Sequence, residues 1–543
     1  MNGKKLIAAA IGNCVHVAGL MHFCRLAEQE GYDVLFLGPA VPVEEVVKAV
    51  GEHRPAMVAV SYRLTPENAR TVVGDFVDAA KKVERSQSIK WLFGGISANA
   101  HIAEEFDFFD YVSDGTDDAG DCIAYLRGTT RKSQAEKGGR DLLSRISVKH
   151  PYPLLRHHYG EPSLNDTVQG IRTIAESRCL DVLSIGPDQN TQQFFFSPEN
   201  RKPSFDGAGG VPLRERRDFV RLKEAAECGN YPLLRCYSGT ADVMRFAELL
   251  VDTIHNAWCA VPLCWYNEID GRGTRTIEVS IKEAQSLMEW HAKRDIPVEI
   301  NEPHHWGLRD APDVISVVMA YISAYNAKKA GVRHYIAQYM FNVPNGISFP
   351  MDMAKNLAMV ELAESLADSD FTMYRQVRAG LPFLSPDVEV AKGQLAASTY
   401  LSMALNPHII HVVGYCEAEQ IAKPHNVIES CKIVKGVLKS ILSDQIDPSK
   451  DERILCRKAE LLDEARFTLG FIQEKYGNRK YPLSDADVLA DCVKLGILDA
   501  PHIVKNEKFV GNINTVFVDG KCVAYDKLKQ RGLTERKRLE KIQ

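Results

Sequence analysis

His16 lies where a metal or a cofactor could reach it. It belongs to the segment NCVHVAG at 13–19, which follows the apolar run Leu6–Ile11. We expect that run to form a buried strand of a parallel sheet, and ligands of such sheets bind beyond the carboxyl ends of the strands. A neutral imidazole there can donate a nitrogen to a metal. Taken alone, His16 is better explained as a loop histidine bonded to backbone, because the chain has 16 histidines in all.

Two further segments should reach the same edge of the sheet. SYRLT at 61–65 ends the third apolar run, and the pair Gly94-Gly95 ends the fourth. Parallel strands present their carboxyl ends at one edge, so we expect both segments near His16. The domain that must position them is a doubly wound α/β domain, predicted from apolar runs that alternate with helical stretches: KLIAAAI, YDVLFLG, MVAVSYR, KWLFGG and YVSDG.

Together these segments resemble the cobalamin-binding domain of corrinoid mutases and methyltransferases. The signature of that family is D-x-H-x-x-G, then an S-x-L-type segment, then a Gly-Gly pair. The connecting phrase GYDVLFLGPAVPVEEVV and the late Gly115-Thr116 fit as well. The resemblance implies a flavodoxin-like fold and a cobalt corrinoid in which His16 replaces the cofactor's own nucleotide base as the metal ligand.

The resemblance also implies how the cofactor is held. Gly19 would let the backbone approach the displaced nucleotide tail, Ser61 would bond the displaced base, and Gly94-Gly95 would leave room for tail and corrin. The full set of cofactor-binding candidates is Cys14, His16, Gly19, Ser61, Leu64, Gly94, Gly95 and Thr116.

Cys14 departs from the family pattern. Where the family has an aspartate that accepts a hydrogen bond from the ligating histidine, this chain has a thiol, which is a weaker partner. Such partners tune the basicity and the orientation of a ligating imidazole. Either Cys14 or Asn13 fills this role poorly, or the bond from His16 to cobalt is weaker here.

A second α/β series follows a segment poor in apolar residues. Its eight apolar runs, with one longer excursion after the second, predict a closed (β/α)₈ barrel. The excursion, FFFSPENRKPSFDGAGGVPLRERR, would be an insertion on the catalytic rim, which lies at the carboxyl ends of the strands. The runs begin at Pro153, Cys179, Pro232, Ala260, Pro297, His334, Phe371 and Ile409.

The predicted organisation therefore has four parts. Residues 1–127 form the doubly wound domain, 128–150 a linker, 151–440 the barrel, and 441–543 a carboxyl-terminal extension. In the extension, helical segments precede TVFVDGKCVAY, which predicts a hairpin turned at Asp519-Gly520.

Several barrel segments resemble the barrel subunit of glutamate mutase, in the same order: YSGTADVMRFAELL, WYNEIDGRGTRTIEVSIKEAQSLMEWHA, INEPHHWGL, RQVRAGLP and CEAEQIAKPHNVIESCKIVK. The resemblance implies a single-chain, adenosylcobalamin-dependent carbon-skeleton mutase. In that chemistry cobalt–carbon homolysis gives a radical that takes hydrogen from the substrate, and the protein positions groups and excludes water.

The same resemblance assigns residues at the barrel rim. Tyr266 matches a tyrosine that lines the substrate pocket, although an aromatic core residue is an equal explanation; Glu417 matches a glutamate that contacts the adenosyl ribose. Gln192 and Tyr237 stand where the family has substrate-clamping arginines, and Ala260 where it has an amine-binding glutamate.

These departures predict a small polar or carboxylate substrate other than glutamate. The catalytic candidates are Arg156, His157, Arg235, Tyr237, Tyr266 and Glu417. Other polar residues beyond the predicted strands, any of which could simply be a satisfied rim residue, are His158, Asp188, Gln189, His304 and His305.

Two rival functions remain open, a methylcobalamin-dependent methyltransferase and a non-catalytic corrinoid carrier. A zinc-dependent methyltransferase would need three converging ligands. Candidates are His304, His305, His408, His411, Cys416 and His425. Because His408 and His411 point to opposite faces of a strand, we prefer structural roles for this set.

Composition limits the partners. The chain has 543 residues, with 66 basic and 71 acidic side chains and a net charge of -5, so no global positive field would hold nucleic acid or a membrane surface. Thirteen cysteines, an odd number without a C-x-x-C pair, favour reduced thiols in the cytoplasm. No apolar run is long enough for a membrane helix. We expect a small-molecule substrate and a homodimer.

Overall fold

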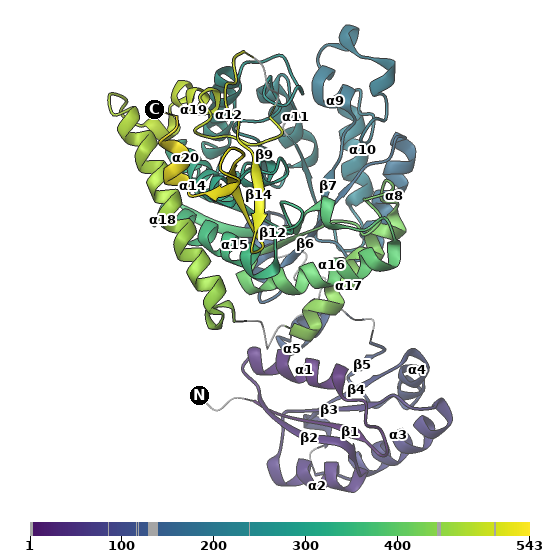
Figure 1. Ribbon diagram of the computed structural model, residues 1–543. Helices are drawn as coiled ribbons and strands as arrows, with labels where there is room; N and C mark the ends of the chain where they lie inside the picture. Colours follow the sequence, from purple (N-terminus) through teal and green to yellow (C-terminus); the bar gives the residue numbers. More distant parts are fainter. Residues whose placement is uncertain are drawn as a thin grey trace. The chain divides into compact units, whose positions relative to one another are not determined.

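The chain folds into two compact units, Met1–Gly139 and Arg140–Gln543 (Figure 1). The computed structural model describes residues 4–84, 86–115, 117, 119–128, 139–237, 239–441, 447–503 and 507–542. Of the predicted linker, 129–138 lie outside the described residues, and Leu142–Lys149 form helix α7.

The amino-terminal unit is a doubly wound domain, as predicted. Its five parallel strands have the order β2-β1-β3-β4-β5, which is the flavodoxin-like order. The order reverses between β1 and β3, so the carboxyl ends of these two strands are where a ligand is expected. The elements are β1 (Lys5–Ile11), α1 (Ala18–Gln29), β2 (Asp33–Val41), α2 (Val43–His53), β3 (Met57–Tyr62), α3 (Pro66–Ala80), β4 (Lys90–Gly95), α4 (Ser97–Glu105), β5 (Tyr111–Ser113) and α5 (Ala119–Leu126).

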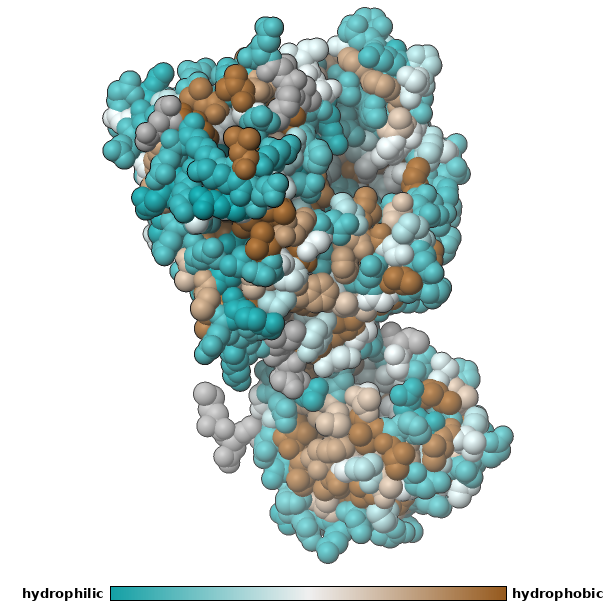
Figure 2. Space-filling model, in the orientation of Figure 1, coloured by the Kyte–Doolittle hydropathy of each residue, from teal (hydrophilic) through white to brown (hydrophobic). Residues whose placement is uncertain are grey.

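Helices cover both faces of this sheet. Figure 1 shows α1 and α5 on one side and α2 and α3 on the other. Every residue of Leu6–Ile11 is therefore buried, which explains why β1 is a continuous apolar run instead of an alternating one. Strand β2 lies at an edge, and its apolar residues Val34–Leu37 are only partly buried. Figure 2 shows hydrophobic residues on the surface in that region.

The second unit contains a nearly closed barrel of eight parallel strands, each of which overlaps one predicted run. The strand order is β8-β7-β6-β13-β12-β11-β10-β9, and β8 and β9 approach each other without ladder hydrogen bonds. The strands are β6 (Leu154–Tyr159), β7 (Val182–Ile185), β8 (Leu233–Cys236), β9 (Cys259–Val261), β10 (Val298–Ile300), β11 (His334–Phe341), β12 (Thr372–Ala379) and β13 (Ile409–Val412).

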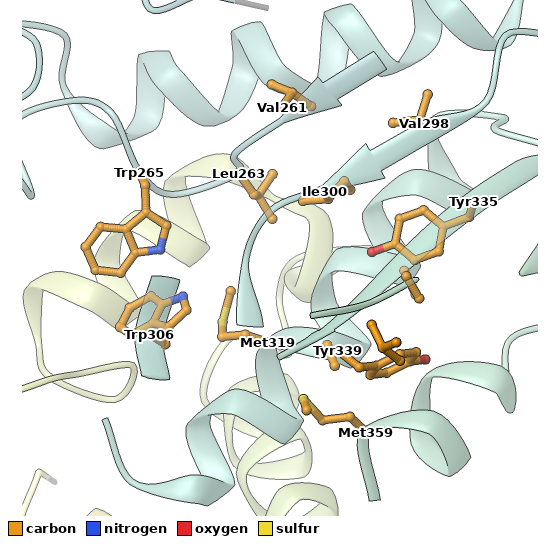
Figure 3. Close-up of a cluster of buried hydrophobic side chains, with 14 of the residues drawn as sticks. Val261, Leu263, Trp265, Val298, Ile300, Trp306, Met319, Tyr335, Tyr339 and Met359 are labelled. Carbon is orange, nitrogen blue, oxygen red and sulfur yellow. The ribbon is translucent and has the colours of Figure 1, made fainter. Parts of the chain in front are cut away.

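Helices surround the barrel and supply its largest core. Figure 3 shows part of this core, where Trp265 and Trp306 meet edge to face with ring centroids 4.9 Å apart. Tyr335 and Tyr339 project outward from β11 toward the helices, and both are buried. The helices are α8 (Leu164–Glu176), α9 (Gln189–Phe194), α10 (Arg216–Ala226), α11 (Val243–Ile254), α12 (Ile277–Ala292), α13 (Pro303–Gly307), α14 (Asp313–Lys329), α15 (Phe349–Glu364), α16 (Val388–Ser402) and α17 (Pro424–Ile441).

The carboxyl-terminal extension packs on the barrel helices. Helix α18 (Glu452–Lys475) lies against α14 and α15, and Arg457 makes a buried ion pair of 2.9 Å with Asp313. The predicted hairpin is confirmed: Asp519 and Gly520 both have positive φ between β14 (Thr515–Val518) and β15 (Lys521–Asp526). The remaining elements are α19 (Ala486–Lys494), β16 (Arg531–Leu533) and α20 (Glu535–Leu539). No helix among the described residues is long and apolar enough to span a bilayer.

Candidate functional site

The loop after β1 carries His16 to the carboxyl edge of the first sheet. Gly12 has a φ of +63° and begins the turn, and the Cys14 N–H donates to the carbonyl of Ile11 at 3.3 Å. Helix α1 begins two residues after His16, whose side chain is exposed. The imidazole is therefore open to a ligand at the switch point of the sheet.

Cys14, and not Asn13, faces the imidazole. The Cys14 side chain is fully buried; its Sγ accepts the Arg63 N–H at 3.3 Å and lies 4.0 Å from Nδ1 of His16. Asn13 is engaged elsewhere, since its Oδ1 accepts the Tyr62 hydroxyl at 3.0 Å. The thiol thus occupies the place where a partner for His16 would act.

Ser61 and Gly94 form an open place beside this loop. They are register partners on β3 and β4, so their side-chain positions share one face of the sheet. The Ser61 hydroxyl is buried and has no hydrogen-bond partner among the described residues. A Cβ at Gly94 would meet no atom within 4 Å. An unpartnered buried hydroxyl beside open space suits a bound polar group, since leaving it unpaired is costly.

The other predicted cofactor residues divide into two groups. Gly19 is exposed with open space at its Cβ position. Gly95 is needed for packing, because a Cβ there would lie 3.0 Å from the Tyr62 carbonyl oxygen. The Leu64 carbonyl accepts a bond from the Asn99 amide, which fixes the loop after β3. Thr116 lies outside the described residues.

The barrel has an ionic interior. Arg156 on β6 bonds Ser184 on β7 at 2.6 Å and Gln376 on β12 at 2.8 Å, and it lies 3.8 Å from Glu299 on β10. These partners come from strands that do not neighbour β6 on the sheet, with the exception of β7. Side chains that meet across the barrel in this way point inward.

Glu299 is the carboxylate of this interior. Its Oε2 accepts the Trp258 indole N–H at 2.6 Å and lies 3.2 Å from the Arg235 guanidinium. Arg235 also stacks on the Tyr237 ring, 4.4 Å from its centroid. Burial, reinforced by the charge of Arg235, lowers the pKa of Arg156 to about 9, because one carboxylate serves two buried guanidiniums.

His157 and Glu417 meet at the carboxyl edge of the barrel. Nδ1 of His157 donates to the His158 carbonyl at 2.5 Å, which leaves Nε2 as the acceptor of a neutral ring. Burial lowers the pKa of His157 despite the opposing charge of Glu417, and Nε2 lies 3.6 Å from Glu417 Oε1. Gly414 donates to the same Oε1 at 2.7 Å, and a Cβ at Gly414 would lie 3.0 Å from both side chains.

Tyr266 lies on the loop after β9 with a φ of +65°, a left-handed conformation that is strained for a tyrosine. Its ring packs edge to face on His305, with centroids 5.4 Å apart, and Arg272 lies over its ring. Burial raises the pKa of the Tyr266 phenol, so the hydroxyl is neutral. The side chain is partly buried and belongs to the same mouth as His304 and His305.

Many buried polar atoms in and around the barrel have no hydrogen-bond partner among the described residues. Among the described residues, buried atoms without a hydrogen-bond partner occur on the barrel strands and on the segments that follow them: His157 Nε2, Arg235 Nε and Nη1, Glu299 Oε1, Asn301 Nδ2 and Oδ1, His304 Nδ1, His305 Nε2, Gln338 Nε2, Gln376 Nε2 and His411 Nδ1. Native interiors keep such atoms few, so a cluster of them indicates a ligand site.

Sequence reasoning missed Glu299, Gln376 and Arg378. Strand alternation could have found the last two, because Tyr374, Gln376 and Arg378 occupy alternate positions of β12 and share its inner face. Glu299 stands among apolar residues in PVEINEP, and a lone carboxylate in a buried strand is itself a signal of pairing.

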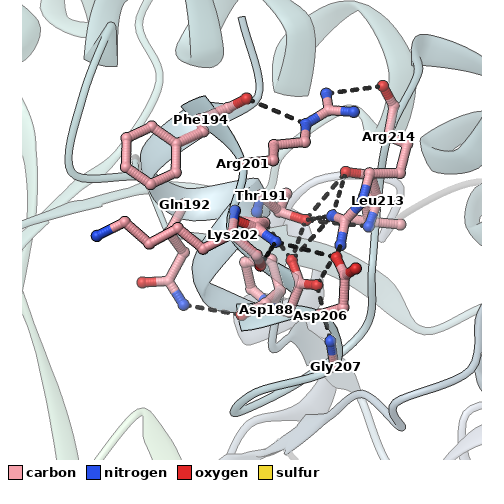
Figure 4. Close-up of polar contacts among 12 residues, drawn as sticks. Asp188, Thr191, Gln192, Phe194, Arg201, Lys202, Asp206, Gly207, Leu213 and Arg214 are labelled. Atoms are coloured by element: carbon pink, nitrogen blue, oxygen red, sulfur yellow. Dashed lines mark hydrogen bonds and ion pairs between the residues drawn. The ribbon is translucent and has the colours of Figure 1, made fainter. Parts of the chain in front are cut away.

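Asp188 faces the rim but has a structural role (Figure 4). It is fully buried, caps α9 through the Thr191 N–H at 2.8 Å, and pairs with Arg214 at 2.5 Å. Arg214 also bonds Asp206, so this pair fastens the long insertion after β7. Gln192 donates to the Pro187 carbonyl at 2.8 Å.

The residues considered as zinc ligands do not form a metal site among the described residues. Within the part of the chain that the structure describes, no group of three or more His, Cys, Asp or Glu side chains could hold a metal ion. Nδ1 of His408 accepts the Arg375 N–H at 3.0 Å, whereas His411 lies inside the barrel against His158.

Residues 4–120 match the family described as B12 binding domain. The amino-terminal unit thus contains a B12 binding domain, and its fold is flavodoxin-like. No curated protein matches the chain.

Three solved structures are similar to parts of the chain. A cobalamin-binding protein from Desulfitobacterium hafniense DCB-2 is 25% identical over 23% of this chain and 57% of its own, with a TM-score of 0.20. The methanol:cobalamin methyltransferase complex MtaBC from Methanosarcina barkeri is 24% identical over 24% and 49%, with a TM-score of 0.20. The cobalamin-dependent S-adenosylmethionine radical enzyme OxsB is 9% identical over 86% and 56%, with a TM-score of 0.18. The chain thus spans 49% to 57% of the length of these structures.

Proposed function

We propose that the protein is an adenosylcobalamin-dependent carbon-skeleton mutase that acts on a small polar or carboxylate substrate other than glutamate. The observation that carries the proposal is the set of buried, unpartnered polar atoms inside the barrel and on the segments after its strands, in one chain with a B12 binding domain. Barrel enzymes perform their chemistry at that end.

The residues of the amino-terminal unit fit a corrinoid. His16 would donate its imidazole nitrogen to cobalt, the Ser61 hydroxyl would bond the displaced nucleotide base, and the open space at Gly94 would receive the tail. When bound, adenosylcobalamin supplies homolytic cobalt–carbon chemistry, which can remove a hydrogen atom from an unactivated carbon.

His157 and Glu417 would bind hydroxyl groups. Both present acceptors, Nε2 of a neutral ring and a carboxylate, and two acceptors cannot hydrogen-bond to each other, so His157 Nε2 needs a donor from a ligand. A ribose or substrate hydroxyl supplies such a donor. Glu417 Oε2 has no hydrogen bond among the described residues and remains for a second one.

The charged interior would hold the substrate and keep the mouth in one shape. Arg156 and Arg235 are fully buried. Ser184 and Gln376 hold the Arg156 guanidinium, whereas Arg235 is held by Glu299 through one nitrogen, which leaves its Nε and Nη1 without a partner among the described residues. A fixed polar lining orients a substrate without reorganising during the reaction. The replacement of the family's clamping residues by Gln192, Tyr237 and Ala260 supports a substrate other than glutamate.

Reduced thiols support a cytoplasmic location as part of the proposal. All 13 cysteines are free, and most of them are buried. Disulfides form in oxidising compartments, so thiol-only chains are typical of reducing ones.

The test is radical formation. We would mix the full chain with adenosylcobalamin and a panel of small amino and hydroxy acids, then record electron paramagnetic resonance spectra. A cob(II)alamin-coupled radical with at least one acid other than glutamate is expected. Glu417→Gln should weaken that signal, whereas Glu419→Gln, an exposed neighbour, should not.

Other outcomes separate the rivals. Methyl transfer from methylcobalamin without any radical would replace the mutase by a methyltransferase. If the protein binds cobalamin but neither reaction occurs with any acid of the panel, the protein is a corrinoid carrier.

A further inference from the structure

Arg378 stands at the mouth of the barrel. It is the penultimate residue of β12, and its register partners are Met340 on β11 and His411 on β13. His411 in turn pairs with Arg156. Register partners share a face, so Arg378 belongs to the inward row that contains Arg156. Unlike Arg156, it is partly exposed, so a ligand can reach it.

The guanidinium of Arg378 lacks a carboxylate. Among the described residues its one hydrogen bond runs from Nε to the Ala379 carbonyl at 3.3 Å, and no acidic side chain lies within 4.0 Å. Arg375, on the same strand, shows the contrast: it forms a two-pronged pair with Glu364 at 2.6 Å and 2.8 Å. Both Nη atoms of Arg378 are therefore available for a bidentate partner.

The charges around Arg378 do not cancel. Arg156 and Arg235 share the single carboxylate of Glu299, and Glu417 lies beside His157. Burial lowers the pKa of Arg378 although Tyr237, Glu417 and Glu299 oppose the shift, so part of the compensating negative charge is missing. A small anion would supply that charge.

Two histidines lie near enough to Arg378 to feel its charge. His304 and His305 are buried on α13, and His304 Nδ1 and His305 Nε2 have no hydrogen-bond partner among the described residues. Burial together with nearby arginines, Arg378 among them, holds both pKa values well below the usual range, so both rings are neutral. A neutral ring can turn its N–H toward a carboxylate oxygen.

We propose that Arg378 binds a carboxylate of the substrate through its two Nη atoms, with His304 or His305 as a neighbouring donor. The inference rests on the proposed function and makes it narrower: the substrate is a small carboxylic acid, and Arg378 determines that specificity. The arginine comes from β12, a strand that carries none of the family's clamping positions identified in the sequence.

The experiment is calorimetric titration of the full chain without any cofactor. The probes are acetate, succinate and glutarate, each compared with its neutral amide. We expect at least one acid to bind more tightly than its amide. Arg378→Gln should weaken that binding about tenfold to a hundredfold, the loss expected for a charge-assisted hydrogen-bonded pair. The affinity of Arg378→Lys should lie between those of the wild type and Arg378→Gln, because lysine keeps the charge but cannot form the bidentate hydrogen bonds of a guanidinium.

Arg217→Gln is the matched control. Arg217 is exposed on α10 and makes no side-chain hydrogen bond or ion pair among the described residues, so the same change of charge should leave binding unaltered. The proposal is overturned if no acid binds, if Arg378→Gln and Arg378→Lys both bind as the wild type does, or if Arg217→Gln causes the same loss. Arg378→Lys decides the question if Arg378→Gln fails to fold.

The outcome is separable from the mutase itself. If carboxylate binding depends on Arg378 but the protein forms no isomer, the role of Arg378 is supported and the proposed mutase reaction is refuted. Isomerisation of an acid by Arg378→Gln with an unchanged KM would keep the reaction and remove the role of Arg378.

Discussion

Replacing Glu299 by glutamine should destabilise the barrel strongly. The Glu299 carboxylate is fully buried, and its Oε2 lies 3.2 Å from Arg235 and 3.8 Å from Arg156, both fully buried as well. Glutamine keeps the shape and can still accept the Trp258 indole N–H, but it leaves two buried guanidiniums without a carboxylate. Breaking a buried ion pair in this way costs about 3–5 kcal/mol, a large part of the 5–15 kcal/mol that typically stabilises a domain.

The assay is urea unfolding followed by tryptophan fluorescence. Four of the five tryptophans belong to the second unit and only Trp91 to the first, so the signal reports the barrel. Asp487→Asn is the control, because the Asp487–Lys282 pair is about half exposed on both sides at 2.8 Å. It should cost at most about 1 kcal/mol. A Glu299→Gln loss no larger than that of the control would refute the ionic interior.

Further variants test the other sites. Cys14→Asp restores the carboxylate that the family places beside the ligating histidine, so it should tighten cobalamin binding about tenfold. Visible absorbance of the bound cobalamin measures the affinity, and Cys14→Ser, which adds no carboxylate, should not tighten binding. Gly94→Val should weaken cobalamin binding at least about tenfold, because the side chain would fill the open space at Gly94. Its stability should change by under about 0.5 kcal/mol, because a Cβ there meets no protein atom. Wild-type affinity for cobalamin would contradict the proposed role of this open space. Glu302 is a fully buried residue directly before α13, and burial raises its pKa from 4.5 to about 7. The folded state therefore binds the extra proton, and stability should fall as pH rises from about 4.5 to 7. In Glu302→Gln the unfolding midpoint should depend less on pH over this range. An unchanged pH dependence would contradict the raised pKa of Glu302.

The sequence was sufficient for the architecture because both folds repeat one local unit. Apolar runs such as KLIAAAI are buried on both faces, and that burial alone makes them continuous and easy to recognise. All eight barrel strands and the hairpin at Asp519-Gly520 followed from such local patterns.

Partners across the barrel were harder to predict. Arg156 meets Gln376 across 220 positions of sequence, and nothing local to either residue specifies that contact. The same holds for Asp188, whose rim position was foreseen but whose pairing with Arg214 depends on how the insertion folds back. Whether an ionisable group is free for a ligand is a property of the whole fold, and this is why Arg378 became a candidate only when its neighbours were known.

The most direct measurement is transfer of label from the cofactor to the substrate. Adenosylcobalamin tritiated at its adenosyl C5′ would be incubated with the full chain and the same panel of acids, and the acids would then be separated and counted. We expect tritium in one acid other than glutamate and in its isomer. Label that stays entirely with the cofactor for every acid, although cobalamin is bound, would contradict the proposed mutase reaction.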